Sequence, residues 1–167
     1  MATAAEPERG AAVDSETRAS ADDHMALRLW LRLLACTNLV EGPLRTRLRE
    51  QFSGSLPRFD LMAQLERHPE GVKMNELSRL LMVTGGNVTA IVDQLEDEGL
   101  VERVDQPADR RAFFIQLTRA GGRRFAEMAR EHEEWVVGLL EGMSRREQDE
   151  LLGLLAKVKQ HAEEITP

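Results

Sequence analysis

The segment that decides the fold is residues 74–96, which read MNELSRLLMVTGGNVTAIVDQLE. Its first half carries leucines at helical spacing, and Asn75 is a residue type that often caps a helix N-terminus. Thr84 is a second N-cap residue, and Gly99 stands where helices commonly end in a left-handed residue. Between them, apolar side chains recur with a helical period at Val88, Ile91, Val92 and Leu95. The segment therefore predicts two short helices joined by a tight turn.

A hairpin is predicted directly after these helices. Residues 100–104 (LVERV) and 112–117 (AFFIQL) have the composition of strands, and the polar segment 105–111 between them contains Pro107. A hairpin that follows two short helices is typical of a wing. We therefore expect a mainly α-helical fold with a small two-stranded β-wing, which is a winged helix-turn-helix with an added helical region.

Longer helices are predicted on both sides of this core. Residues 23–51 show helical periodicity, and the Glu41-Gly42-Pro43 segment is expected to kink or divide that helix because proline lacks a backbone donor. Further helix starts are expected at Pro57, at Thr118 and at a Ser144–Glu147 capping box.

Composition completes the predicted domain organisation. The first 22 residues contain almost no large apolar side chain, and such a segment cannot offset its ordering entropy by burial. We expect a disordered arm at residues 1–22, an N-terminal helix for dimerisation and effector binding at 23–56, a winged domain at 57–118 and C-terminal dimerisation helices at 119–167.

The charge of the chain is acidic as a whole and basic in one place. The net charge of −7 for 167 residues argues by itself against nucleic acid as a partner. Between Gly99 and Arg124, however, six arginines stand against three acidic residues, which gives a local charge of +3. A nucleic-acid interface would therefore have to be local. Neither an apolar membrane span nor a secretion signal is visible, so a cytoplasmic protein is expected.

Three stretches together resemble the MarR family of bacterial transcriptional regulators. They are residues 74–96, the GLVER segment at 99–103, and the PADRR segment at 107–111 followed by IQLT at 115–118 and Gly121. With the flanking helices, the resemblance covers about residues 25–163. Two departures stand out: Gln106 replaces an Asp that the family often has, and Gly85-Gly86 opens the second helix, where most relatives carry side chains.

The resemblance implies a DNA-binding regulator, by family default a repressor. The second helix would enter the major groove with its N-terminal end. The wing would place Arg111 in the minor groove, with Asp109 orienting it and Arg110 on a phosphate. The expected contacts of the helix are Thr84, Gly85, Gly86, Asn87 and Thr89. The alternative for the two glycines is that they only shape the turn.

A symmetric homodimer is the expected assembly. Apolar residues at both ends of the chain, among them Trp30, Trp135 and Leu151, are more than a winged domain can cover. Two copies would present two recognition helices, and a near-palindromic double-stranded operator would match them.

An aromatic acid or an aryl-CoA thioester is the expected small-molecule effector. The resemblance is strongest to regulators of aromatic catabolism that respond to hydroxycinnamoyl-CoA thioesters. Arginines suit the phosphates of CoA. The candidate effector-binding residues are Trp30, Arg45, Arg47, Arg49, Phe59 and Met62. The alternative for Phe59 and Met62 is a place in the core, and for the arginines a contact with water, a carboxylate or DNA.

Three other functions are considered beside this one. Redox sensing would use Cys36, but the chain has no tyrosine to support it, and a thiol in an apolar helix is usually inert. The four histidines are scattered, so no metal site is expected, and neither a cofactor nor an enzyme motif is visible. A winged-helix module that binds only protein would not need Arg110 and Arg111.

Overall fold

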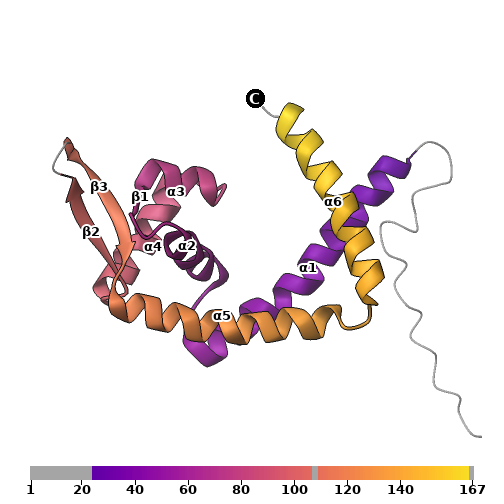
Figure 1. The fold of residues 1–167 in the computed structure, drawn as a ribbon, viewed down its shortest axis with the longest axis horizontal. Helices are drawn as coiled ribbons and strands as arrows, with labels where there is room; N and C mark the ends of the chain where they lie inside the picture. The colour runs from indigo at the N-terminus through magenta and orange to yellow at the C-terminus, as the bar shows by residue number, and fades with distance from the viewer. Residues whose placement is uncertain (1–23, 107–108, 166–167) are drawn as a thin grey trace, which may run out of the picture. The chain divides into compact units, whose positions relative to one another are not determined.

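This computed structural model describes residues 24–106 and 109–165, and it describes side chains outside residues 106–112. Within these ranges the chain forms six helices and three strands (Figure 1). The helices are α1 (Met25–Phe52), α2 (Leu56–Arg67), α3 (Met74–Leu80), α4 (Gly85–Asp97), α5 (Arg119–Leu140) and α6 (Arg145–Ile165). The strands are β1 (Val72–Lys73), β2 (Val101–Gln106) and β3 (Asp109–Leu117).

The described chain divides into two compact units, one up to Gly42 and one from Pro43 onward. The division falls inside α1, which is one continuous helix with Pro43 in its interior. The helix is therefore not divided at the Glu41–Pro43 segment, although the boundary between the two units falls there. None of the described helices has the length and apolar character needed to cross a membrane.

The expected winged fold is confirmed, with one more strand than the sequence predicted. The sheet is antiparallel in the order β1-β3-β2, and Ile115 of β3 lies opposite both Val72 of β1 and Arg103 of β2. The hairpin of β2 and β3 projects from the helices around it (Figure 1). The two strands of the hairpin, 101–106 and 109–117, are longer than the expected strands at 100–104 and 112–117. β1 has only two residues, too few for any periodic pattern, which is why the sequence did not show it.

The core of the winged unit lies between the sheet and the three short helices. Its fully buried members come from α2 (Leu61, Met62, Leu65), α3 (Leu77), α4 (Val88, Val92, Leu95) and the strands (Val72, Val101, Ile115). The inner stripe predicted for residues 88–95 is confirmed, because three of its four members are buried and Ile91 packs against the same core.

Helix starts follow the sequence signals in most places. Pro57 lies in the first turn of α2, and the Thr118 Oγ1 accepts a hydrogen bond from the Gly121 N–H at the start of α5. The N-cap of α3 is Lys73, so the prediction of Asn75 as the cap is wrong. The reason is β1: the chain passes from this strand directly into the helix, two residues earlier than the side-chain preference indicates.

The capping box before α6 is confirmed. The Ser144 N–H donates to the Glu147 carboxylate at 2.8 Å, and the Glu147 N–H donates to the Ser144 Oγ at 3.4 Å. These contacts satisfy two backbone donors that the start of a helix leaves without partners.

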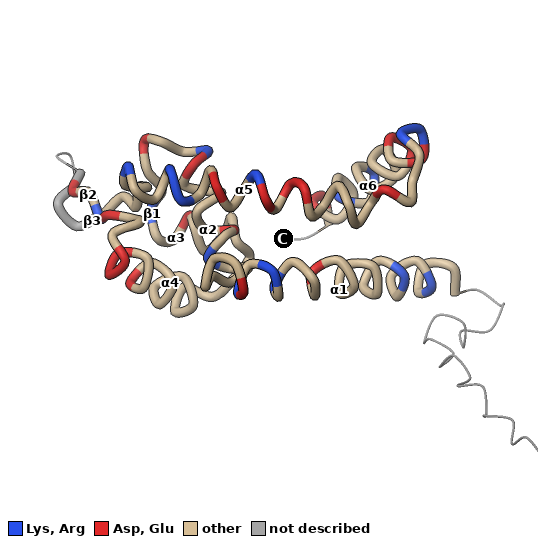
Figure 2. The backbone as a smooth tube through the Cα atoms, turned by 90° about the horizontal axis from the view of Figure 1, so that it is seen from below, with Lys and Arg blue, Asp and Glu red and all other residues tan. Residues whose placement is uncertain are grey.

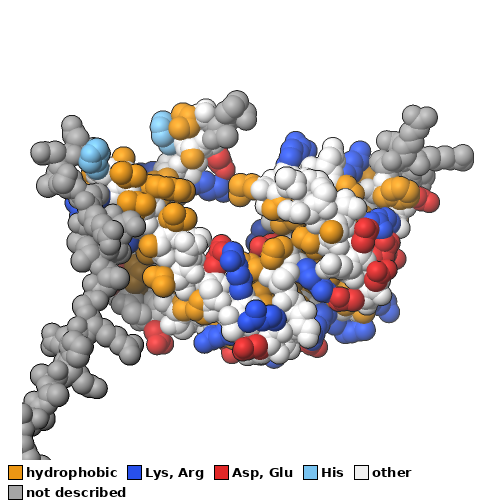
Figure 3. All heavy atoms as spheres, turned by 180° about the vertical axis from the view of Figure 1, so that it is seen from behind, with side chains coloured by type: hydrophobic (Ala, Val, Ile, Leu, Met, Phe, Trp, Pro, Cys, Tyr) orange, Lys and Arg blue, Asp and Glu red, His pale blue; other side chains and the backbone are white. Residues whose placement is uncertain are grey.

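α6 itself, all of which the structure describes, has no buried residue. Other elements carry exposed apolar side chains as well, and Figure 3 shows such side chains on one face of the surface.

Candidate nucleic-acid interface

The N-terminal half of α4 is exposed on the side opposite the core. Val88 and Val92 turn inward and are fully buried, whereas Thr84 and residues 85–87 are exposed. Thr84 has the extended backbone of an N-cap, although its side chain makes no capping hydrogen bond. The five residues predicted for the recognition helix therefore lie on one accessible helix end.

Gly85 and Gly86 are not required by the packing of the protein. A Cβ added at Gly86 would meet nothing within 4 Å, and one added at Gly85 would meet only the Ser78 Oγ at 3.8 Å. The left-handed glycines of the described chain are Gly71 and Gly99, and the left-handed residue of the turn before α4 is Met82, with φ 53°. Glycine also weakens a helix, so neither the packing nor the helix propensity of α4 accounts for this pair.

The Thr89 hydroxyl is already engaged inside α4. Its Oγ1 donates to the Gly85 carbonyl oxygen at 3.0 Å, which uses the only proton that this hydroxyl has. The methyl group and the oxygen lone pairs of Thr89 stay available on the exposed surface. The structure therefore leaves the Thr89 methyl group available for contact, while the Asn87 amide and the Thr84 hydroxyl are exposed polar groups of this helix end.

The wing carries the second set of predicted residues. The backbone of β3 begins at Asp109, which lies opposite Gln106 of β2 beyond an irregularity in the register. The first three residues of this strand are Asp109, Arg110 and Arg111. Their side chains lie outside the described residues.

The recognition helix is acidic and is held by arginines from other elements. α4 contains Asp93, Glu96 and Asp97 and neither lysine nor arginine (Figure 2). Arg103 of β2 forms ion pairs with both Asp93 and Glu96. These pairs leave no pattern in the sequence, because their members are seven and ten residues apart and meet only across the turn between α4 and β2.

Comparison with known proteins gives consistent matches. The family model described as the MarR family matches residues 55–112. A crystal structure of a MarR family transcriptional regulator from Silicibacter pomeroyi is 34% identical, covers 82% of this chain and 94% of its own, and superposes with a TM-score of 0.70. This chain belongs to the MarR family of transcriptional regulators.

Other relatives agree with this membership. The regulator PecS of Dickeya dadantii is 31% identical over 64% of this chain, and the match spans 66% of PecS. An uncharacterised regulator of Bacillus subtilis, YkoM, is 30% identical, and the match spans 60% of its length. The match thus spans less than two thirds of each of these curated relatives. Sco3205 of Streptomyces coelicolor, solved in complex with DNA, is 25% identical with a TM-score of 0.72, over 83% of this chain and 86% of its own. The family and these relatives are transcriptional regulators and not enzymes.

Some residues predicted for effector binding meet in an aromatic cluster of the second unit. Phe59 of α2 stacks on His132 of α5, with ring centroids 4.5 Å apart, and it also packs against Phe125. The guanidinium of Arg47 lies over the Trp135 ring at 5.7 Å. Burial lowers the pKa of His132 below its ordinary value. We call Phe59, Phe125, His132 and Trp135 the aromatic cluster.

The remaining effector candidates lie elsewhere. Met62 is 1% exposed and belongs to the core. Arg45 and Arg49 are exposed on α1. Trp30 is 58% exposed and belongs to the first unit.

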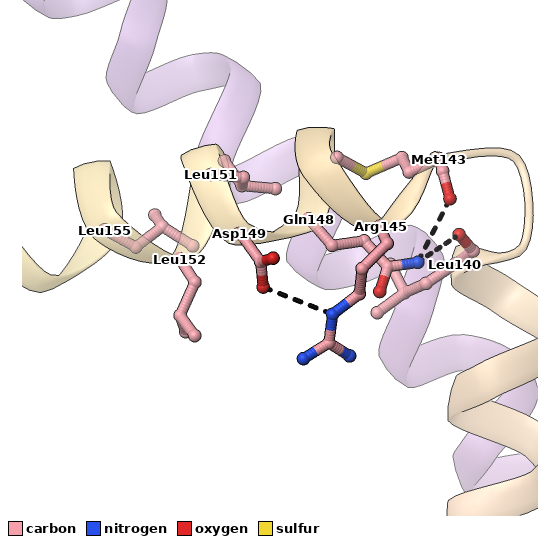
Figure 4. Close-up of a pocket in the computed structure, with 8 residues that line it drawn as sticks. All are labelled: Leu140, Met143, Arg145, Gln148, Asp149, Leu151, Leu152 and Leu155. Atoms are coloured by element: carbon pink, nitrogen blue, oxygen red, sulfur yellow. Dashed lines mark hydrogen bonds and ion pairs between the residues drawn. The ribbon is translucent and has the colours of Figure 1, made fainter.

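A separate apolar pocket lies where α5 turns into α6. It has a volume of about 280 Å³, and it contains none of the predicted effector residues. The Gln148 amide closes one side by donating to the Met143 carbonyl oxygen at 3.1 Å, and Arg145 pairs with Asp149 at its edge (Figure 4). Its lining residues are Leu140, Met143, Arg145, Gln148, Asp149, Leu151, Leu152 and Leu155.

The residues of the competing sensing modes are also placed. Cys36 is exposed, in contrast to the apolar surroundings that the sequence suggested. Within residues 24–106 and 109–165, the structure contains no group of three or more potential ligands that could hold a metal ion.

Proposed function

We propose that this MarR family chain regulates transcription by binding double-stranded DNA through α4 and the β2–β3 hairpin. The observation that carries the proposal is the exposed, nearly side-chain-free start of α4, where Gly86 has open space around it that the protein itself does not use. The DNA complex of the relative Sco3205 supports the same use of this fold. Such a protein would act in the cytoplasm.

The start of α4 would lie in the major groove. Asn87 can donate to and accept from an adenine edge, and the Thr89 methyl can contact a thymine methyl. The backbone N–H groups of Gly85 and Gly86 can approach a phosphate closely because no Cβ intervenes. The hairpin would lie along the adjacent minor groove, where Arg111 is attracted by the narrow-groove potential, Asp109 orients it and Arg110 contacts a phosphate.

The operator would be near-palindromic because the protein would bind as a homodimer. The apolar side chains of α6 are between 37% and 69% exposed, and Trp30 on α1 is 58% exposed. Contact with a second copy would remove this apolar surface from water. The α6 side chains concerned are Leu151, Leu152, Leu154, Leu155 and Val158.

A small-molecule effector would then control DNA binding, with repression released by an aromatic acid or an aryl-CoA thioester. Arg45, Arg47 and Arg49 on α1 are the cations of this model. Phe59 and Met62, being buried, would form the wall behind a ligand. A thermal-shift screen of aromatic acids and their CoA esters, followed by release of the DNA with any hit, tests this step.

The DNA proposal is tested by fluorescence anisotropy with a labelled duplex taken from the region upstream of the gene that encodes this chain. The affinity should fall steeply as salt rises, because phosphate contacts release counterions. A logarithmic slope near zero would contradict phosphate contacts. The variant Arg111→Ala should bind more weakly and still elute as a dimer in gel filtration, whereas unchanged affinity would remove the wing from the interface.

A further inference from the structure

The helix that would enter the DNA carries an electrostatic problem. α4 has three carboxylates and no cationic side chain of its own, and Glu98 follows as its C-cap. Phosphates repel carboxylates over roughly 10 Å at moderate salt concentration. A helix of this composition therefore needs cations from neighbouring elements if it is to approach DNA.

One of these carboxylates lies on the face that points toward the DNA in the proposed complex. Asp93 follows Gly86 by seven residues, which is almost two full helical turns, so both residues lie on one face of α4. The Asp93 side chain is 54% exposed. Glu96, one turn farther along, is 35% exposed.

Both carboxylates meet the same cation. The Arg103 guanidinium donates through Nη2 to the Asp93 Oδ1 and through Nη1 to the Glu96 Oε2. Arg103 reaches them from β2, where the ladder fixes its position opposite Ile115, a fully buried core residue. Its side chain is 29% exposed, less than that of either carboxylate residue that it pairs with.

We propose that Arg103 is a charge-masking residue for the recognition helix, which offsets one of the two negative charges of Asp93 and Glu96 where α4 faces the DNA. This inference rests on the proposed DNA binding. Arg103 does not contact DNA in this account and acts through the two carboxylates. Partly exposed ion pairs add little to folding stability. In this account the two ion pairs of Arg103 matter because they make the electrostatic potential at the DNA-facing side of α4 less negative.

Four proteins test the masking role: the wild type, R103Q, D93N/E96Q and the triple variant D93N/E96Q/R103Q. Binding is measured by anisotropy with the upstream duplex and with a random-sequence duplex. R103Q should bind about tenfold more weakly at low salt, and its affinity should approach that of the wild type as salt screens the carboxylates. The triple variant should bind at least as tightly as the wild type, because it has lost both carboxylates as well as the arginine. D93N/E96Q should bind at least as tightly as the wild type.

A matched control is available at the far end of the same helix. Arg58 of α2 pairs with Glu98, which lies past the last turn of α4 and off the Gly86 face. R58Q makes the same chemical change in an arginine–carboxylate pair and should change the DNA affinity by less than about twofold. Thermal melts of all variants report whether the fold is kept.

The outcomes separate the inference from the proposed function. If the wild type binds neither duplex in a salt-dependent manner, the proposed function fails and the masking role fails with it. If the wild type binds and R103Q binds equally well, only the masking role is overturned. It is also overturned if D93N/E96Q loses affinity or the triple variant stays weak, since Arg103 would then act as a mechanical tether. D93N/E96Q keeps the test decisive even if R103Q does not fold.

Discussion

Gly121, in the first turn of α5, packs directly against the backbone of Leu100, the residue before β2. A Cβ on Gly121 would lie 2.8 Å from the Leu100 carbonyl carbon, closer still to its oxygen, and 3.2 Å from a methyl group of Leu117. Thr118 ties the same corner, because its hydroxyl donates to the Gly99 carbonyl oxygen at 2.7 Å and accepts from the Gly121 N–H. The chain just before β2, the end of β3 and the start of α5 are therefore packed together at one corner.

Gly121→Ala should destabilise the protein strongly. The new methyl group collides with backbone atoms that cannot rotate away, and overpacking of this kind costs about 3 kcal/mol of unfolding free energy. Urea unfolding followed by circular dichroism measures the change. Gly122→Ala is the control, because nothing lies within 4 Å of a Cβ there and alanine favours the helix by up to about 1 kcal/mol. Equal effects of the two substitutions would contradict the packing argument.

The contrast between Gly121 and Gly122 shows which features of the fold could be predicted from the sequence and which could not. N-cap residues, helical period and the wing composition located α4 and the hairpin, because those signals are local in the chain. The family resemblance singled out Gly121 but gave no reason for it. The reason is a contact with Leu100, 21 positions away, which exists only after the hairpin has formed.

The same limit applies to the candidate site. The sequence could place Thr84 and residues 85–87 at an exposed helix end, because the N-cap residue and the first apolar position, Val88, are both visible in the local sequence. The pairing of Arg103 with Asp93 and Glu96 could not, since a helix, a turn and a strand must all be in place before the groups meet. Likewise, Phe59 and His132 belong to helices far apart in the chain, and only tertiary packing stacks their rings.

His132 should make folding stability depend on pH. Burial lowers its pKa, so the folded protein prefers the neutral imidazole that stacks on Phe59. Below the ordinary pKa of about 6.5, the unfolded chain binds a proton more readily than the folded one. Stability should therefore fall as pH decreases from about 6.5 to the lower pKa of the folded state, and it should be fully present above 6.5.

The substitution His132→Phe should remove this part of the pH dependence. Urea unfolding at about pH 7.5 and about pH 5.5 measures it, and the wild type should lose more stability than the variant over this interval. His161→Gln on α6, where the ring is exposed near Glu164, is the control and should keep the wild-type difference. An identical pH dependence in His132→Phe would show that other groups cause the effect.

Ser144→Ala should weaken the start of α6 by about 1 kcal/mol of unfolding free energy, the usual cost of losing an N-cap. The Ser144 hydroxyl and backbone N–H both hold the pKa of Glu147 below its ordinary value. The substitution removes the hydroxyl, so the pKa of Glu147 should rise toward that value in a carboxyl-detected NMR titration. Ser144→Thr, which keeps a hydroxyl, should change both quantities less. A Glu147 pKa that does not move in Ser144→Ala would argue against the reciprocal cap.

Gly86→Ala should raise stability and lower DNA affinity at the same time. Alanine fits the open space at this position and favours the helix, by up to about 1 kcal/mol, so the folded protein loses nothing. In the proposed complex, however, the added methyl group would hold the α4 backbone away from the DNA. Thermal melts and anisotropy with the upstream duplex measure the two effects, and Gly122→Ala should raise stability without changing affinity. If Gly86→Ala binds as tightly as the wild type, the backbone of α4 does not approach the DNA closely, and readout would have to depend on Asn87 and on the wing.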